Sequence, residues 1–137
     1  MTQDHLHRIR NKALRDRIVS ADQAASLIRD GMVLGMSGFT RAGEAKAVPM
    51  ALAERAKRAP MKVTLMTGAS LGNDLDKTMA EAGMLSRRIP FMSDPALRRA
   101  INAGEVMYID QHLSETVEQL RTCQLPPVDI AIIEAVA

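Results

Sequence analysis

The chain has 137 residues, an apolar fraction of 47%, a charged fraction of 25% and a formal net charge of +2. This length suits one domain with its own core, and the composition excludes a disordered chain. Cys123 is the only cysteine, which excludes a disulfide framework and indicates a reducing compartment, most simply the cytoplasm. No apolar run approaches the ~18 residues of a membrane helix, so we expect no contact with a membrane.

Residues 1–19 form a basic segment. Five basic and two acidic residues lie within residues 1–17, so the positive charge of the chain is concentrated there. No aromatic residue is interleaved with RIRNKALRDR, which favours a solvated or subunit-contacting helix over a nucleic-acid arm. His5 and His7 have no set of cysteines or carboxylates at ligand spacing, so no metal site is expected. We predict a basic arm over residues 1–19 and an α/β domain over residues 20–137.

The first elements of that domain have clear boundaries. Serine and glutamine at positions 20 and 23 have the S-x-x-Q spacing of a capping box, and Gly31 marks the expected helix end, about three turns later. The inward face of this helix is expected to hold Ala24, Leu27 and Ile28. The run MVLGM at 32–36 predicts a buried strand, and Pro49 marks the first turn of a helix that ends before Pro60.

Strand and helix signals alternate through the rest of the chain. They predict a strand and turn at 61–70, a helix at 74–83, a short strand at 87–93, a helix capped by Asp94 that ends at Gly104, a strand at 106–109, a helix at 114–123 with Val117 and Leu120 inward, and a final buried strand at 128–136. Such alternation predicts an α/β fold, a mostly parallel open sheet with helices on both faces. Ligand sites in such sheets lie at the carboxyl ends of strands.

One such end is the stretch GMSGFTRAGEAKAVP, from Gly35 to Pro49. Gly38 and Gly43 have the spacing of a P-loop, but glutamate and alanine follow where lysine and a hydroxyl residue are needed. A nucleoside triphosphate site is therefore disfavoured. The G-x-G-x-x-G pattern of a dinucleotide site is not met either.

Two loops remain as candidate ligand sites, this one and TGAS at 67–70. Glycines and small hydroxyl residues at strand ends can present backbone N–H groups to an anion or a carbonyl, although tight turns required by packing would produce the same pattern. Both loops should open on the same edge of the sheet, which favours a site. The candidate residues are Ser37, Gly38, Phe39, Thr40, Gly43, Thr67, Gly68, Ala69 and Ser70.

Glu134 is a further candidate, because it follows the apolar run AII of the final strand. A carboxylate is costly to bury unpaired, so it either faces the site or ends the strand. With no acid or base partner beside it, a role at the site edge or in a polar network is favoured over that of a nucleophile.

Four separated stretches, GMSGFTRAGEAKAVPMALAE, LMTGAS, INAGEVMYIDQHLSE and VDIAIIEAVA, occur in the order and spacing of a known family. Together they resemble the amino-terminal half of the acetyl-CoA hydrolase/transferase family, which contains class I CoA-transferases. The resemblance covers nearly the whole chain after Arg8. It implies the amino-terminal domain of the CoA-transferase fold, truncated before its end.

The resemblance implies that an acyl-CoA and a small carboxylate (acetate, succinate or propionate) exchange CoA through a thioester on an enzyme glutamate. CoA would be a substrate, with no permanently bound cofactor, and the enzyme a homo-oligomer. The family's catalytic glutamate and its main CoA-binding loop belong to the second half, so no catalytic residue is expected here and the 137 residues alone should be inactive. An acetyl-CoA hydrolase and a non-catalytic small-molecule-binding module remain alternatives. A sugar-phosphate isomerase would need acid and base residues that the sequence does not provide.

Overall fold

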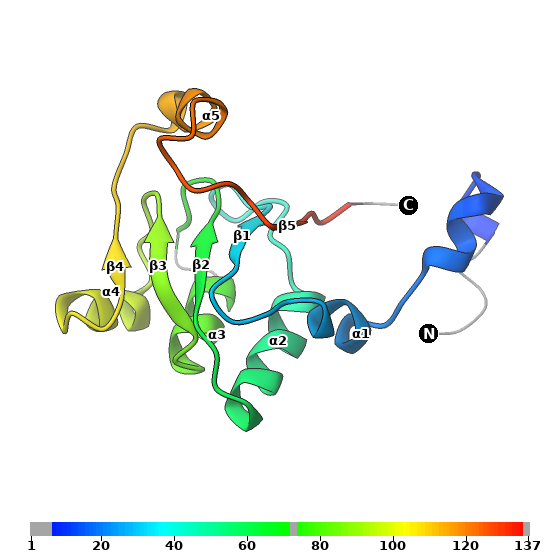
Figure 1. The fold of residues 1–137 in the computed structure, drawn as a ribbon, viewed down its shortest axis with the longest axis horizontal. Coiled ribbons are helices and arrows are strands. Elements are labelled where there is room, and N and C mark those ends of the chain that lie inside the picture. Colours follow the sequence, from blue (N-terminus) through cyan, green and yellow to red (C-terminus); the bar gives the residue numbers. More distant parts are fainter. Residues whose placement is uncertain (1–6, 72–73, 136–137) are drawn as a thin grey trace.

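The computed structural model describes residues 7–71 and 74–135. Within them, one sheet of five parallel strands has the order β4-β3-β2-β1-β5 (Figure 1). The strands are β1 (Val33–Met36), β2 (Val63–Met66), β3 (Leu85–Ile89), β4 (Met107–Tyr108) and β5 (Ile130–Ile132). The predicted parallel α/β sheet is therefore confirmed.

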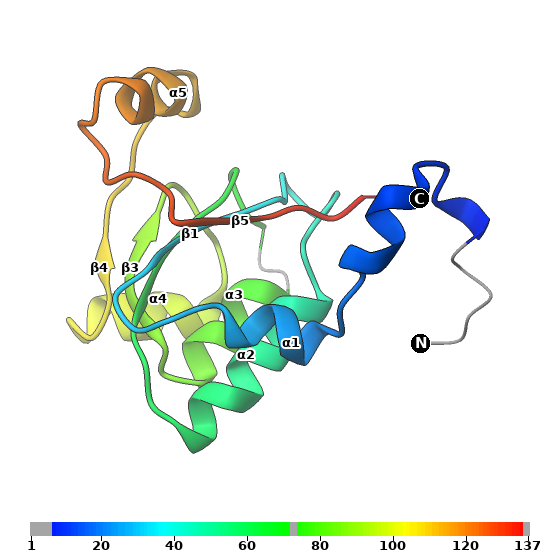
Figure 2. The same ribbon diagram turned by 45° about the vertical axis from the view of Figure 1, so that its right-hand side comes forward.

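Helices lie on both faces of this sheet, but unequally. One face is covered by α1 (Ala21–Ser26), α2 (Ala47–Arg58), α3 (Asp74–Glu81) and α4 (Pro95–Asn102), which lie side by side below the sheet in Figure 2. The other face has a smaller apolar cluster, against which Leu120 of α5 (Leu113–Arg121) packs, although no residue of α5 is fully buried. Side chains alternate across a strand, and β1, β2 and β3 contribute residues to both layers of the core.

The core follows this division. The main apolar cluster joins the four helices to the lower face of the sheet, with fully buried residues such as Leu34, Leu52 and Leu65. A smaller cluster on the upper face contains Val33, Met66, Ile89 and Leu125, with Leu120 of α5 packed against it.

Both predicted helix caps are confirmed. The side chain of Ser20 accepts from the amide of Gln23 and the side chain of Gln23 accepts from the amide of Ser20, completing the capping box. The side chain of Asp94 accepts from the amide of Leu97 at 2.8 Å. These contacts satisfy amides that a helix start leaves without partners.

Several predicted details are wrong. Helix α1 ends at Ser26, well before Gly31, so the inward residues are Ala25 and Ile28 while Leu27 is 67% exposed. On α5, Val117 is 74% exposed, because this helix contacts the sheet through Leu120 and not through a continuous stripe.

The last strand also differs from its predicted range and burial. β5 is three residues long and pairs only with β1, so it is an edge strand of the described sheet. Ile133, which follows it, is 73% exposed. The prediction of a buried final strand over 128–136 is therefore wrong for the described residues, since an edge strand has one neighbour only.

The described part of the basic arm contains a 3-10 helix, η2 (Lys12–Arg17), without a buried residue. It lies apart from the sheet beyond α1 (Figures 1 and 2). The division into an arm at 1–19 and a domain at 20–137 stays a prediction, and residues 1–6, with His5, lie outside the described residues. Of the helices described, none has the length and apolar character needed to cross a bilayer.

Candidate functional site

The two candidate loops lie against each other at the carboxyl ends of β1 and β2. The amide of Thr40 donates to the carbonyl of Ala69 at 2.7 Å, and the amide of Gly68 donates to the carbonyl of Gly38 at 3.1 Å. A third loop joins them, because the amide of Ser70 donates to the carbonyl of Phe91 after β3 at 3.1 Å. Ser70 therefore lies in the middle of the three loops, and its backbone is bridged to Thr40 on one side and to Met92 on the other.

Close packing between the loops explains Gly68. A Cβ atom at this position would lie 2.6 Å from the carbonyl oxygen of Gly38 and 3.3 Å from the ring of Phe39. Only glycine fits there without moving the first loop. At Gly68, therefore, close packing of the two loops is enough to explain why the residue is small.

The first loop has its own internal structure. Phe39 and Ala42 exchange two backbone hydrogen bonds of 3.0 Å, and the hydroxyl of Ser37 donates to the carbonyl of Gly43 at 2.7 Å. Gly38 has φ +140, which side chains rarely permit, and Thr40 has φ 57. The tip projects outward, with Phe39 57% exposed.

Glu134 joins this loop from the other side. It follows β5, its amide donates to the hydroxyl of Ser37 at 2.8 Å, and its carboxylate pairs with the Nζ of Lys46 at 2.8 Å. The side chains of this ion pair are largely exposed, so the carboxylate is not buried without a partner. Of the two positions that the sequence allowed, the structure has Glu134 beyond the strand end, in a polar network around the first loop.

Beneath the second loop lies a buried ion pair that the sequence did not reveal. Arg88 in β3 and Asp76 in α3 are 0% exposed and their Nε and Oδ1 atoms are 2.8 Å apart. Arg88 also donates to the hydroxyl of Thr67 at 2.7 Å. In the sequence, Arg88 stands beside a second arginine, Arg87, in the predicted short strand at 87–93, so no local signal distinguished the two.

Ser70 differs from the other loop residues. It is 6% exposed, and among the described residues its hydroxyl oxygen is the buried side-chain atom without a hydrogen-bond partner. An unpaired buried hydroxyl is costly, and a ligand oxygen would remove that cost. Ser70 is therefore the strongest candidate ligand contact among the nine loop residues.

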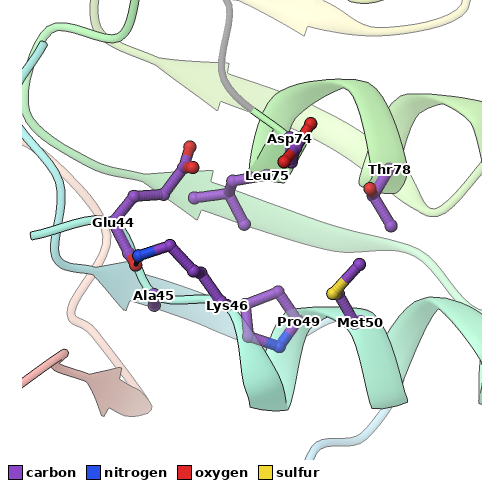
Figure 3. A pocket seen from close by; sticks show the side chains of 8 residues that line it. All are labelled: Glu44, Ala45, Lys46, Pro49, Met50, Asp74, Leu75 and Thr78. Carbon is purple, nitrogen blue, oxygen red and sulfur yellow. Dashed lines mark hydrogen bonds between the residues drawn. The ribbon is translucent and has the colours of Figure 1, made fainter. Parts of the chain in front are cut away.

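A small cavity lies next to the first loop (Figure 3). It is lined by Glu44, Ala45, Lys46, Pro49, Met50, Asp74, Leu75 and Thr78, and about 50 Å³ of it is open to a water-sized molecule. Figure 3 shows the Glu44 side chain extending toward the start of α3, where Asp74 lies. This cavity is too small for an acyl-CoA. No group of three or more histidine, cysteine or carboxylate side chains suited to a metal occurs within residues 7–71 and 74–135.

Three curated relatives are similar to this chain over most of its length. The chain is 46% identical over 132 residues to a succinyl-CoA:acetate CoA-transferase from Clostridium kluyveri, covering 95% of this chain and 24% of the relative. It is 36% identical to a propanoyl-CoA:succinate CoA transferase from Escherichia coli, with 87% and 25% covered, and 34% identical to an acetyl-CoA hydrolase from Schizosaccharomyces pombe, with 95% and 27% covered. The chain thus spans about a quarter of the length of these relatives.

Solved structures show the same fold at lower identity. RipA from Yersinia pestis is 23% identical with a TM-score of 0.64, covering 89% of this chain and 30% of that chain. A variant of the decarboxylase AibA/AibB is 22% identical with a TM-score of 0.59, covering 79% and 44%.

The model of the acetyl-CoA hydrolase/transferase N-terminal domain matches residues 3–137. This match covers nearly the whole sequence, and it agrees with the parallel sheet and with the curated relatives. The chain therefore belongs to the acetyl-CoA hydrolase/transferase family, of which it contains the amino-terminal domain.

Proposed function

We propose that this chain is the amino-terminal part of an acyl-CoA:carboxylate CoA-transferase, and that its loops at 37–43 and 67–70 form one wall of the pocket for the acyl or carboxylate group. The names of the relatives support CoA transfer between small acids. The observation that carries the assignment to these loops is the buried, unpaired hydroxyl of Ser70.

A carboxylate or a thioester carbonyl offers the partner that this hydroxyl lacks. Both groups present an oxygen that accepts hydrogen bonds, and the serine hydroxyl has one proton to donate. The ligand would reach it from the carboxyl edge of the sheet, where the three loops meet. Ser70 would thereby bind and orient the substrate, without itself forming a bond to carbon.

The reaction needs a nucleophile that we assign to a glutamate outside residues 1–137. Its carboxylate would attack the acyl-CoA carbonyl and release the CoA thiolate, which then attacks the glutamyl carbonyl and leaves a glutamyl-CoA thioester and a free carboxylate. Attack by the second carboxylate reverses these steps. The loops of this chain would hold the carboxyl group of the substrate during the exchange.

The alternative is an acetyl-CoA hydrolase, which is favoured by the relative of that name that covers 95% of this chain. In that case water, and not a carboxylate, would release the product from the enzyme. The wall formed by the loops would be the same, because both reactions begin with the same acyl-CoA.

The test uses the full-length protein, purified and incubated with acetyl-CoA in the presence and absence of succinate or propionate. A transferase forms a new acyl-CoA only when a carboxylate acceptor is present, whereas a hydrolase releases free CoA without an acceptor. Binding of acetyl-CoA without any turnover would contradict both and would support a non-catalytic binding module.

A further inference from the structure

The buried ion pair of Arg88 and Asp76 lies beneath the proposed site and has no part in the reaction above. Both side chains are 0% exposed, and two Arg88 nitrogens donate to the Asp76 carboxylate, at 2.8 and 3.3 Å. Asp76 is in the first turn of α3 and Arg88 is next to the end of β3. The pair thus joins a helix to the sheet directly below the loop at 67–70.

Stability alone is a weak reason for such a pair. Removing two charges from water costs about as much free energy as their attraction returns, and apolar residues of similar volume often replace a buried pair without loss. A functional reason should therefore lie in the other contacts of Arg88. Its guanidinium also donates to the carbonyl of Ile89 and, at 2.7 Å, to the hydroxyl of Thr67.

The contact with Arg88 fixes the direction of the Thr67 hydroxyl. Arginine has donors only and stays charged at any ordinary pH, so the hydroxyl oxygen must accept from it. The hydroxyl proton is then free to donate, and it is directed at the carbonyl oxygen of Gly68. The backbone of Thr67 is also held, because its amide donates to the carbonyl of Ile89 at 3.1 Å.

This direction determines how the next peptide group is oriented. The peptide between Gly68 and Ala69 is trans, so its carbonyl and its N–H point in opposite directions. With the carbonyl held by Thr67, the amide of Ala69 points away from Thr67. Within the described part of the chain this amide has no acceptor, whereas the amides of Thr67, Gly68 and Ser70 all donate to backbone carbonyls.

We propose that Arg88, held by Asp76, is a positioning residue that acts through Thr67 to aim the amide of Ala69 at a carboxylate or carbonyl oxygen of the substrate. This inference rests on the proposed function, because it supplies a second hydrogen-bond donor beside Ser70. The backbone amide of Ala69 would be a specific ligand contact, and its orientation would explain why Arg88 and Asp76 are buried as a charged pair.

The test compares Thr67→Val with Thr67→Ser in the full-length protein. Valine has the shape of threonine without the hydroxyl, so the peptide at 68–69 loses its constraint, while serine keeps the hydroxyl. We expect Thr67→Val to lower kcat/KM for acyl-CoA with carboxylate about tenfold or more, and Thr67→Ser to restore most of it. We also expect Thr67→Val to speed amide hydrogen exchange in the segment 67–71.

Thr122→Val is the matched control. Its hydroxyl also donates to a backbone carbonyl, that of Glu118 at 2.7 Å, but it lies at the end of α5. This variant should leave kcat/KM and exchange at 67–71 unchanged. The double variant Arg88→Met/Asp76→Leu removes both charges together, so that no buried charge is left unpaired, and it should reproduce the loss seen in Thr67→Val.

The two proposals fail in different ways. If the wild-type protein transfers no CoA, the proposed function is wrong, and the exchange at 67–71 alone then tests the positioning role. If Thr67→Val keeps wild-type kcat/KM and wild-type exchange at 67–71, the positioning role is wrong, whatever the reaction. A double variant that folds and keeps full activity would overturn it as well.

Discussion

Replacement of Ser70 by alanine should stabilise the protein and impair its reaction. The Ser70 hydroxyl is buried without a partner among the described residues, and such a group costs about 1–3 kcal/mol. Alanine removes the hydroxyl and leaves little space behind. We expect an increase of about 1 kcal/mol in the free energy of unfolding, seen as a higher Tm.

The same substitution should weaken the binding of the carboxylate substrate. A hydrogen bond to a charged carboxylate is worth about 1.5–3 kcal/mol, so its loss should weaken the interaction with the carboxylate roughly 10- to 100-fold. The assay is CoA transfer by the full-length protein at varied carboxylate concentration, with Tm measured by calorimetry on the same samples.

Ser86→Ala is the control for this prediction. The hydroxyl of Ser86 donates to the carbonyl of Val63 at 3.0 Å, away from the loops. Because Ser86 is exposed, its removal should change the free energy of unfolding by less than about 1 kcal/mol, and it should leave the kinetics unchanged. If Ser70→Ala instead loses stability and keeps wild-type kinetics, then Ser70 is a structural residue and the pocket wall lies elsewhere.

Three further predictions concern the loops and helix caps. Gly68→Ala should destabilise the protein by about 1–3 kcal/mol, seen as a lower Tm, because the new Cβ would lie 2.6 Å from the carbonyl oxygen of Gly38; an unchanged Tm would mean that the two loops do not pack as described. Glu134→Gln breaks the exposed pair with Lys46, so urea unfolding should show a loss below about 1 kcal/mol and transfer should remain measurable; complete loss of activity in a folded variant would show that the role of Glu134 has been misjudged. Asp94→Ala removes the cap of α4 and should cost about 1 kcal/mol in urea unfolding without changing kcat, and a cost near zero would contradict the cap.

The sequence predicted the fold well where a local signal has a single physical meaning. The capping box at Ser20 and the cap at Asp94 are both present, because each fixes a helix start through short-range hydrogen bonds. It failed where burial depends on distant parts of the chain. Val117 and Ile133 are apolar and were expected inside, but their exposure is decided by which elements pack against α5 and β5, and no local pattern contains that information.

The candidate site was predicted in outline only. That the loops follow neighbouring parallel strands was enough to expect them at one edge, and the contact between Thr40 and Ala69 shows that they meet. The pairing of Arg88 with Asp76 could not be predicted, because it depends on the register of β3 against α3 across the core. The unpaired hydroxyl of Ser70 is likewise a three-dimensional property, invisible in the sequence TGAS.

We propose that this chain forms a pocket wall and that the nucleophile lies outside it. Mass spectrometry tests this most directly: the full-length protein is incubated with acetyl-CoA, the glutamyl thioester is trapped by reduction, and the modified peptide is identified. We predict a single modified glutamate outside residues 1–137, formed more slowly in Ser70→Ala. A modified Glu44 or Glu134, or turnover with no covalent adduct at all, would show that the nucleophile has been wrongly assigned.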